Sequence, residues 1–160
     1  MIRSDREVTD FNDILSIIDR CDVCRLGLND PEGYPYILPL NFGYTVEANR
    51  LTLLFHGSLQ GKKHDLMRAD NRASFEMDCS HQLGYNAERG YCTMNYESVM
   101  GRGHIEYIED EQERLRALTL LTDRMHPEGH FDFSLGALPR TTVFKLIVAE
   151  MTAKRKNSKI

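Results

Sequence analysis

The sequence predicts a mainly β protein with helices, in which an antiparallel sheet closes into a small barrel. Its 160 residues are enough to bury a core, and no linker or repeat divides them, so we expect residues 1–160 to form one domain. About six strand-like segments follow one another, and turns join most of them. A parallel sheet would instead need regular crossover helices between its strands.

Runs of apolar residues with strand character occupy residues 23–28, 34–44, 50–55, 73–78, 91–108 and 142–151. Turn-forming residues at 29–33 and 47–49 separate the first three runs. Because Pro35 and Pro39 lack an N–H donor, the second run cannot pair fully along both of its edges. The polar, glycine-containing segment 80–90 is predicted to be a loop.

Two or three helices complete the predicted elements. The first follows a cap at Thr9 or Asp10, and its apolar residues recur at helical spacing: Phe11, Ile14, Leu15 and Ile18. A short second helix is expected at 62–68. The third is expected from residue 110 or 111 to about 125, with a buried side formed by Leu115, Leu118, Leu121 and Met125. The segment 127–139 is predicted to be a loop.

Composition and charge argue against several functional classes. The formal net charge is −4, with acids and bases interspersed, whereas a nucleic-acid-binding protein would usually present a basic face. No apolar run is long enough to cross a bilayer, so no membrane span is predicted. The first ten residues, MIRSDREVTD, contain no apolar stretch of the kind found in signal peptides. We therefore expect a cytoplasmic protein.

The cysteines and histidines do not predict a metal site. Cys21 and Cys24 have the spacing of half a zinc site, but the other two cysteines are too far apart to supply the second half. We expect all four cysteines to be reduced thiols that pack as small apolar groups. His126 and His130 have helical spacing, but a proline and a glycine lie between them, which favours a loop.

The segment LTLLFHGSLQGKKHDLMRAD, residues 51–70, has the chemistry of a phosphate site. Gly57, Ser58, Gly61, Lys62 and Lys63 lie where a buried strand ends and a helix begins. A helix start offers unpaired N–H groups and the positive end of the helix dipole, and glycines allow close approach to the backbone. The spacing is not that of a nucleoside-triphosphate loop, which favours a terminal monophosphate without a metal. The alternative is an exposed helix start with two solvated lysines.

The strand at 34–44 adds a second indication. Its sequence, YPYILPLNFGY, mixes aromatic residues, prolines and glycine. Prolines interrupt the hydrogen-bond ladder, so neighbouring backbone groups remain available to a flat polar ring. Alone, this run fits an ordinary edge strand. Beside a phosphate site, it favours a flat heterocycle that carries a phosphate.

Four segments in combination resemble a known family: RSDREVTD, GYPYILPLNFGY, FHGSLQGKK and SVMGRGHIE. The chain resembles the 5-nitroimidazole resistance proteins, which belong to the pyridoxamine 5′-phosphate oxidase-like, flavin-binding split-barrel group. The resemblance extends from about residue 3 to residue 154. It implies a six-stranded antiparallel split β-barrel and a homodimer with FMN bound at the interface between its subunits.

The resemblance also implies roles for individual residues. Backbone contacts to the flavin ring would come from Pro39, Leu40 and Asn41. The side chains facing the phosphate end would be His56, Ser58, Lys62 and Lys63. The partner subunit would contribute Ser98 and Val99. His56 is also the expected catalytic residue, as a donor of a proton or hydrogen bond near the flavin. In some relatives the matching histidine is linked to a covalent or haem-type ligand.

The leading functional expectation is an FMN-dependent reductase that takes electrons from NADH or NADPH. It would pass them in pairs to a small nitroaromatic substrate such as a 5-nitroimidazole, bypassing the reactive nitro radical and so giving drug resistance. The alternative is a non-catalytic protein that binds a flavin, FMN or FAD, or haem. A pyridoxamine-phosphate oxidase is a weaker expectation, because those enzymes carry a C-terminal segment with arginine and tryptophan, and this sequence has no tryptophan.

Overall fold

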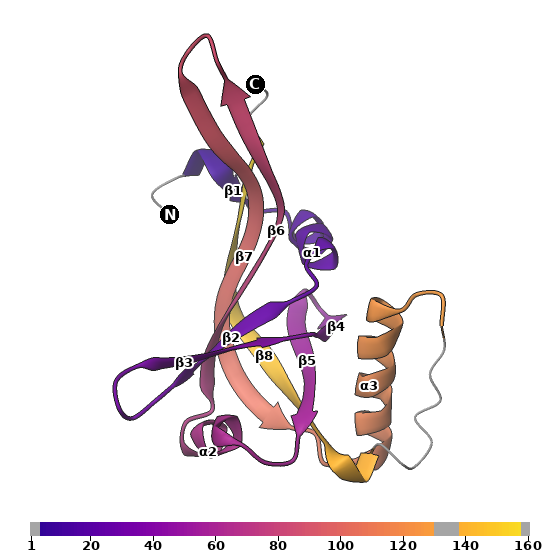
Figure 1. Ribbon diagram of the computed structural model, residues 1–160. Coiled ribbons are helices and arrows are strands. Elements are labelled where there is room, and N and C mark those ends of the chain that lie inside the picture. Colours follow the sequence, from indigo (N-terminus) through magenta and orange to yellow (C-terminus); the bar gives the residue numbers. More distant parts are fainter. Residues whose placement is uncertain (1–3, 130–137, 158–160) are drawn as a thin grey trace.

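The computed structural model describes residues 4–129 and 138–157, which form one antiparallel sheet with helices packed against it (Figure 1). The strands are β1 (Glu7–Val8), β2 (Cys24–Asn29), β3 (Pro35–Leu40), β4 (Gly43–Glu47), β5 (Arg50–Ser58), β6 (Arg72–Asn86), β7 (Tyr91–Tyr107) and β8 (Thr141–Lys156). The helices are α1 (Phe11–Arg20), α2 (Lys62–Ala69) and α3 (Glu111–Met125), with short 3-10 helices at Ser4–Arg6 and Leu138–Arg140.

The strands follow the order β3-β2-β6-β7-β8-β5-β4, with β1 paired to β8, and every pairing is antiparallel. This confirms the predicted class, with eight strands in the described residues instead of six. One additional strand is the short β1. The other arises because the run at 34–44 divides into β3 and β4, where Phe42 turns fully into the core.

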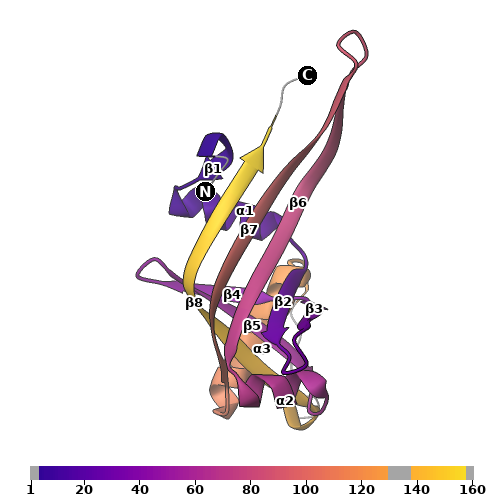
Figure 2. The same ribbon diagram turned by 90° about the vertical axis from the view of Figure 1, so that its left-hand side faces the viewer.

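The predicted loop at 80–90 is wrong over most of its length. β6 continues to Asn86 and β7 begins at Tyr91, so only a tight turn remains between them. A β-bulge between Cys79 and Gln82, where Ser80 has a φ of 58°, shifts the register and breaks the alternation of polar and apolar residues. The resulting hairpin extends well beyond the body of the protein (Figure 2).

The helix predictions are largely confirmed. Asp10 caps α1 by accepting a 2.8 Å hydrogen bond from the Asp13 amide, and Asp110 caps α3 in the same way at 2.9 Å from the Glu113 amide. The buried side of α3 consists of Ala117, Leu118 and Leu121. Leu115, which the pattern placed on that side, is instead 39% exposed, because it lies beyond the edge of the apolar cluster formed with β5 and β8.

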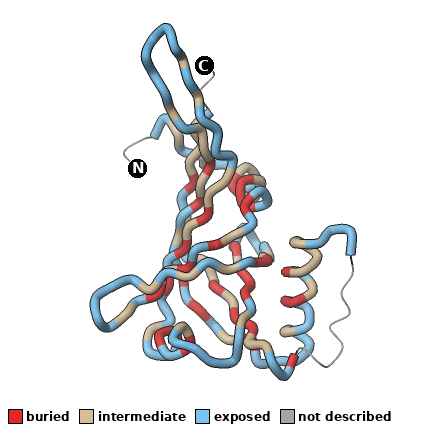
Figure 3. The backbone as a smooth tube through the Cα atoms, viewed as in Figure 1, coloured by how far each residue is buried: buried red, intermediate tan, exposed pale blue. Residues whose placement is uncertain are grey.

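The core lies between the inner face of the sheet and α1, and a smaller apolar cluster lies beneath α3 (Figure 3). On β7, Val99 and Ile105 point inward, whereas Met100 points outward. Gly103 also lies on the inner side, and a Cβ there would collide with the Ile147 carbonyl of β8, so only glycine allows this close approach.

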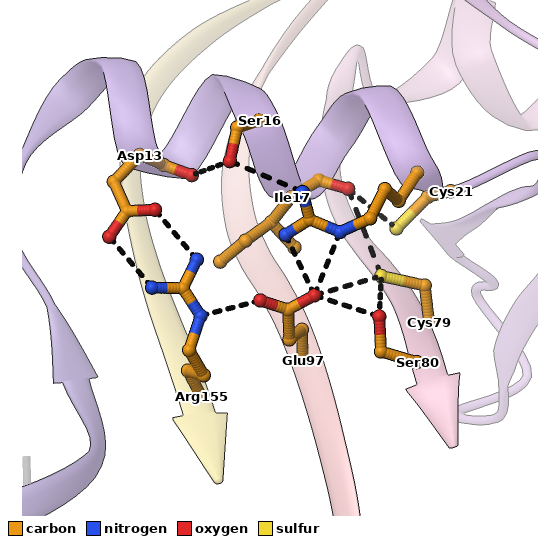
Figure 4. Close-up of polar contacts among 9 residues, drawn as sticks. Asp13, Ser16, Ile17, Cys21, Cys79, Ser80, Glu97 and Arg155 are labelled. Atoms are coloured by element: carbon orange, nitrogen blue, oxygen red, sulfur yellow. Dashed lines mark hydrogen bonds and ion pairs between the residues drawn. The ribbon is translucent and has the colours of Figure 1, made fainter. Parts of the chain in front are cut away.

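An ionic cluster around the buried carboxylate of Glu97 fastens α1 to the sheet (Figure 4). Glu97 of β7 is 8% exposed, and its carboxylate lies 2.7 Å from Arg20 Nη2 and 2.5 Å from Arg155 Nε. Arg155 also forms a two-pronged pair with Asp13, and the Ser80 hydroxyl donates to Glu97 at 2.8 Å. Burial opposes ionisation of Glu97, but the hydrogen bonds outweigh it and keep its pKa below the ordinary value. Every charge in this cluster therefore has a partner within the chain.

Candidate functional site

The segment between β5 and α2 brings a hydroxyl and an ammonium group together, as the sequence predicted. The Lys63 ammonium donates to the Ser58 hydroxyl at 3.2 Å, and that hydroxyl donates to the Gln60 carbonyl at 2.7 Å. Gly61 begins α2 with a φ of 136° and provides no capping side chain. The start of this helix therefore presents an ammonium group and a hydroxyl beside backbone N–H groups that no side chain caps.

Gly57 has a role that the sequence did not reveal. A Cβ at this position would lie 3.0 Å from Lys63 Cε and 3.4 Å from its Nζ. The Lys63 side chain thus crosses over the strand at the point where a larger residue would obstruct it. The glycine allows the lysine to reach Ser58, which is a more specific purpose than the ligand approach expected from the sequence.

The two adjacent lysines point to different partners. Lys62 Nζ lies 2.6 Å from the Asp30 carboxylate in the β2–β3 turn and 5.6 Å from the centre of the Tyr36 ring. Its hydrogen bond lowers the pKa of Asp30 and raises that of Lys62. Within residues 4–129 and 138–157, by contrast, no carboxylate lies within ion-pair distance of Lys63. Lys63 is therefore the better prepared of the two for an anionic ligand.

His56 lies two residues before Ser58 but on a different side of β5 from Lys63. Side chains alternate along a strand, so His56 shares its side of β5 with Ser58, whereas Gly57, against which the Lys63 side chain lies, faces the other side. Its cross-strand neighbour is Val143, a member of the apolar cluster beneath α3. The side chain reaches solvent, yet the protein around it desolvates the ring enough to lower its pKa. At neutral pH this imidazole is uncharged and does not contact the Ser58–Lys63 pair.

Pro39, Leu40 and Asn41 lie at the end of an edge strand, as predicted. Pro39 pairs with Arg25 and Leu40 with Cys24, both on β2, and no described strand pairs with the other edge of β3. The Asn41 amide donates to the Asp22 carbonyl at 3.0 Å, which fixes the chain where β3 ends. Backbone groups on the open edge remain available to a ligand.

Ser98 and Val99 are distant from this cluster within one chain. Tyr107, which contacts α2, is nine residues further along β7, a separation of roughly 30 Å in an extended strand. The Val99 side chain is fully buried in the core, so only its backbone is available for contacts. Ser98 faces outward, on the same side of β7 as Met100 and Arg102.

Comparison with known proteins identifies the family. The pyridoxamine 5′-phosphate oxidase family matches residues 10–155. A candidate 5-nitroimidazole antibiotic resistance protein from Bacteroides thetaiotaomicron is 33% identical, over 92% of this chain and 85% of that one, with a TM-score of 0.81. The chain belongs to the pyridoxamine 5′-phosphate oxidase family. The resemblance inferred from the sequence is thereby confirmed.

More distant relatives of this family share the fold alone. A flavocytochrome from Azotobacter vinelandii is 21% identical, with 95% of this chain and 70% of that one covered and a TM-score of 0.76. An FAD- and haem-binding protein from Mycobacterium smegmatis is 18% identical, with 96% and 74% covered and a TM-score of 0.77. No curated protein sequence matches the chain.

The donor groups at the start of α2 fit the phosphate of the flavin that this family implies. Lys63 has a hydroxyl as its polar partner and keeps its positive charge uncompensated within the described chain, while Ser58 and the helix start supply neutral donors. Lys62 fits less directly, because Asp30 already neutralises it. Of the two lysines that the sequence suggested, Lys63 thus has the charge more available to an anion.

Two features of the molecule escaped the sequence analysis. On the outer face of β6, β7 and β8, two hollows of about 550 Å³ and about 490 Å³ share Ser74 and Arg102, on the face that carries Ser98. The alternation of exposed and buried residues along β7 marks that face, but only once the strand is known.

The second feature is His64, which is 1% exposed and hydrogen-bonds to the Ser58 carbonyl. Nothing in its local sequence distinguishes it from an exposed histidine on a short helix.

The described residues contain no group of three or more His, Cys, Asp or Glu side chains arranged to hold a metal ion. His130 and residues 130–137 of the predicted loop lie outside the described residues. Cys21 and Cys24 are buried thiols, as predicted, whereas Cys92 is exposed. In the part of the chain that the structure describes, no helix has the length and apolar character required to cross a membrane.

Proposed function

We propose that this protein is a flavin-dependent reductase that binds FMN and uses NADH or NADPH to reduce nitroaromatic compounds such as 5-nitroimidazoles. The Ser58–Lys63 pair carries the proposal, because an ammonium group and a hydroxyl lie together at a helix start, where the family resemblance expects the phosphate. The 33% identical relative from Bacteroides supports the choice of acceptor. Bound flavin would supply the two-electron chemistry, which side chains alone lack.

Individual residues have distinct tasks in this proposal. Lys63 and Ser58 bind the phosphate, while Lys62 supports them by holding the Asp30 turn against α2. The open edge of β3 at Pro39, Leu40 and Asn41 offers backbone groups to the ring. His56, neutral at pH 7, donates a proton or hydrogen bond near the ring.

A homodimer would complete the site. The outer face of β6, β7 and β8 presents Met100, which is 52% exposed, and the hollows around Arg102. If this face meets a second copy, Ser98 and the backbone of Val99 can reach the cofactor of the partner. Light scattering on size-exclusion fractions should give a dimer, and Met100→Lys should shift it toward monomer. A wild-type monomer that binds FMN tightly would remove Ser98 and Val99 from the site.

The first experiment is an absorption spectrum of freshly purified protein, with mass spectrometry of the released ligand. Flavin bands with FMN in the extract, bleached by NADH or NADPH under anaerobic conditions, support the proposal. Reoxidation by a 5-nitroimidazole establishes the acceptor: one turnover delivers two electrons and gives the nitroso compound, and three turnovers with three equivalents of NADH or NADPH give the amine. A colourless protein that takes up no added FMN would refute it, and FAD in the extract would replace FMN as the cofactor.

The accessible, uncharged His56 favours one second candidate, a non-catalytic protein that binds a flavin or haem. In that case the ligand stays bound and no nicotinamide donor reduces it. A Soret band that His56→Ala abolishes would transfer the assignment to haem binding. Peroxide release from pyridoxamine 5′-phosphate would instead indicate the oxidase activity for which the family is named.

A further inference from the structure

His64 is built into the floor of the candidate phosphate site. It is the third residue of α2, it is 1% exposed, and both of its ring nitrogens have partners. Nε2 lies 2.7 Å from the Ser58 carbonyl oxygen, and Nδ1 lies 2.9 Å from the Tyr107 hydroxyl. One side chain thus joins the end of β5, the start of α2 and the end of β7.

The partners determine which nitrogen carries the proton. A carbonyl oxygen can only accept a hydrogen bond, so Nε2 must be protonated to bind Ser58. In a neutral ring Nδ1 is then an acceptor, and the Tyr107 hydroxyl must donate to it. Tyr107 therefore stabilises the tautomer that the Ser58 contact requires, in the way that outer partners set the tautomer of a functional histidine.

We propose that His64 is a positioning residue that fixes the Ser58–Lys63 segment for anion binding, with Tyr107 setting its tautomer. The inference rests on the proposed function, because the anion is the cofactor phosphate. The His64 ring binds the Ser58 carbonyl and so fixes the Ser58 backbone. The Ser58 hydroxyl then stays in place to accept a hydrogen bond from Lys63. The His64 backbone amide also donates to the Gly61 carbonyl at 2.9 Å. His64 therefore holds this turn through both its backbone and its side chain.

The surroundings of His64 favour its neutral form. Of the charged residues on α2, Lys63, Arg68 and Asp65 act on the ring, the first two positive and the third negative, while β5 contributes the Ser58 carbonyl and β7 the Tyr107 hydroxyl. Burial, assisted by the two cations, outweighs the carbonyl contact and lowers the pKa of the imidazole. At neutral pH the His64 imidazole is therefore uncharged.

Three variants separate positioning from general structural support. Glutamine offers an amide NH2 donor and a carbonyl acceptor, so His64→Gln can keep both contacts, whereas His64→Leu fills the space and keeps neither. Tyr107→Phe removes only the hydroxyl and retains ring packing against Phe144, whose centre lies 6.3 Å away. FMN affinity is measured by fluorescence quenching. The ¹⁵N shifts of the His64 ring report its tautomer in the cofactor-free protein.

We expect His64→Leu to weaken FMN binding about tenfold, His64→Gln to restore most of that loss, and Tyr107→Phe to cost roughly threefold. The wild-type ring should show a protonated Nε2, and the amide shifts of residues 58–63 should move in His64→Leu without FMN. A protonated Nδ1 alone, or equal FMN affinity in wild type and His64→Leu, would overturn the positioning role while the flavin proposal stands. A wild type that binds no FMN would overturn the proposed function itself.

Discussion

Two charged clusters along the same sheet differ in how completely their charges are paired. Around Glu97, two arginines meet two carboxylates, and the Ser80 hydroxyl satisfies a further lone pair (Figure 4). At the start of α2, the Ser58 hydroxyl is the one polar partner of Lys63 among the described residues, and the buried His64 imidazole is neutral. Both clusters are anchored by long-range contacts, but only the second has a charge left for a ligand.

The difference separates a structural cluster from a binding site. A cluster built on a buried, fully paired carboxylate is costly to break, because loss of that carboxylate removes the acceptor that several groups share. A cation paired with a neutral group contributes little to folding, yet it can form a strong charge-assisted bond with an incoming phosphate. Substitutions in the two clusters should therefore affect different quantities, the free energy of unfolding in one and the affinity for FMN in the other.

The largest effect is expected from Glu97→Ala. Arg20, Arg155 and the Ser80 hydroxyl would all lose their shared acceptor, but both arginines reach solvent and Arg155 keeps Asp13, so the free energy of unfolding should fall by about 3 kcal/mol, the low end for a broken buried pair. Urea denaturation, followed by circular dichroism, measures the free energy of unfolding of the variant and the wild type.

Glu106→Ala is the matched control on the same strand. Its carboxylate pairs with Lys145 at 3.3 Å, but the Glu106 side chain is 52% exposed, so its loss should cost less than about 1 kcal/mol. Equal destabilisation by both substitutions would contradict the distinction between the buried cluster and an ordinary surface pair.

The next effect concerns affinity. Lys63→Met keeps the length of the side chain but removes its charge, and FMN binding should weaken by about 1.5–3 kcal/mol, a roughly 10- to 100-fold rise in Kd. Stability should change little. Lys62→Met should raise Kd much less, because Asp30 already neutralises that ammonium group. Equal losses from the two single variants would mean that both lysines contact the phosphate.

Much of the fold could be predicted from local signals. Asp10 and Asp110 mark helix starts through their own side chains, and Pro35 and Pro39 mark an edge strand by lacking a donor. The long β6–β7 hairpin escaped prediction because it projects from the body and has exposed residues on both faces, so no apolar alternation identifies it. The bulge at Ser80 shifts the pattern further.

The candidate site was predictable to the extent that its parts are adjacent in sequence. Ser58 and Lys63 are five residues apart and do meet. The partners that give each residue its role come from elsewhere. Lys62 finds Asp30 on another turn, and His64 finds Tyr107 at a separation of 43 residues. The sequence showed two similar lysines, and only the fold distinguishes the neutralised one from the other.

The smallest effect is expected on stability when the pH is lowered. Burial lowers the pKa of His64 and of His56 below the ordinary 6.5, so as pH falls through 6.5 the unfolded chain binds these protons before the folded chain does. The stability associated with neutral imidazoles is therefore complete above about pH 6.5 and decreases from there toward the lower pKa of the folded protein.

Melting temperatures between pH 8 and pH 5 should decline in the wild type and decline less in His64→Gln. His56→Gln is the control on the exposed side of β5, and its change should be the smaller of the two because solvent still reaches that ring. Parallel declines in all three proteins would show that the fold does not force either histidine to stay neutral. The buried His64 ring would then tolerate a positive charge beside Lys63.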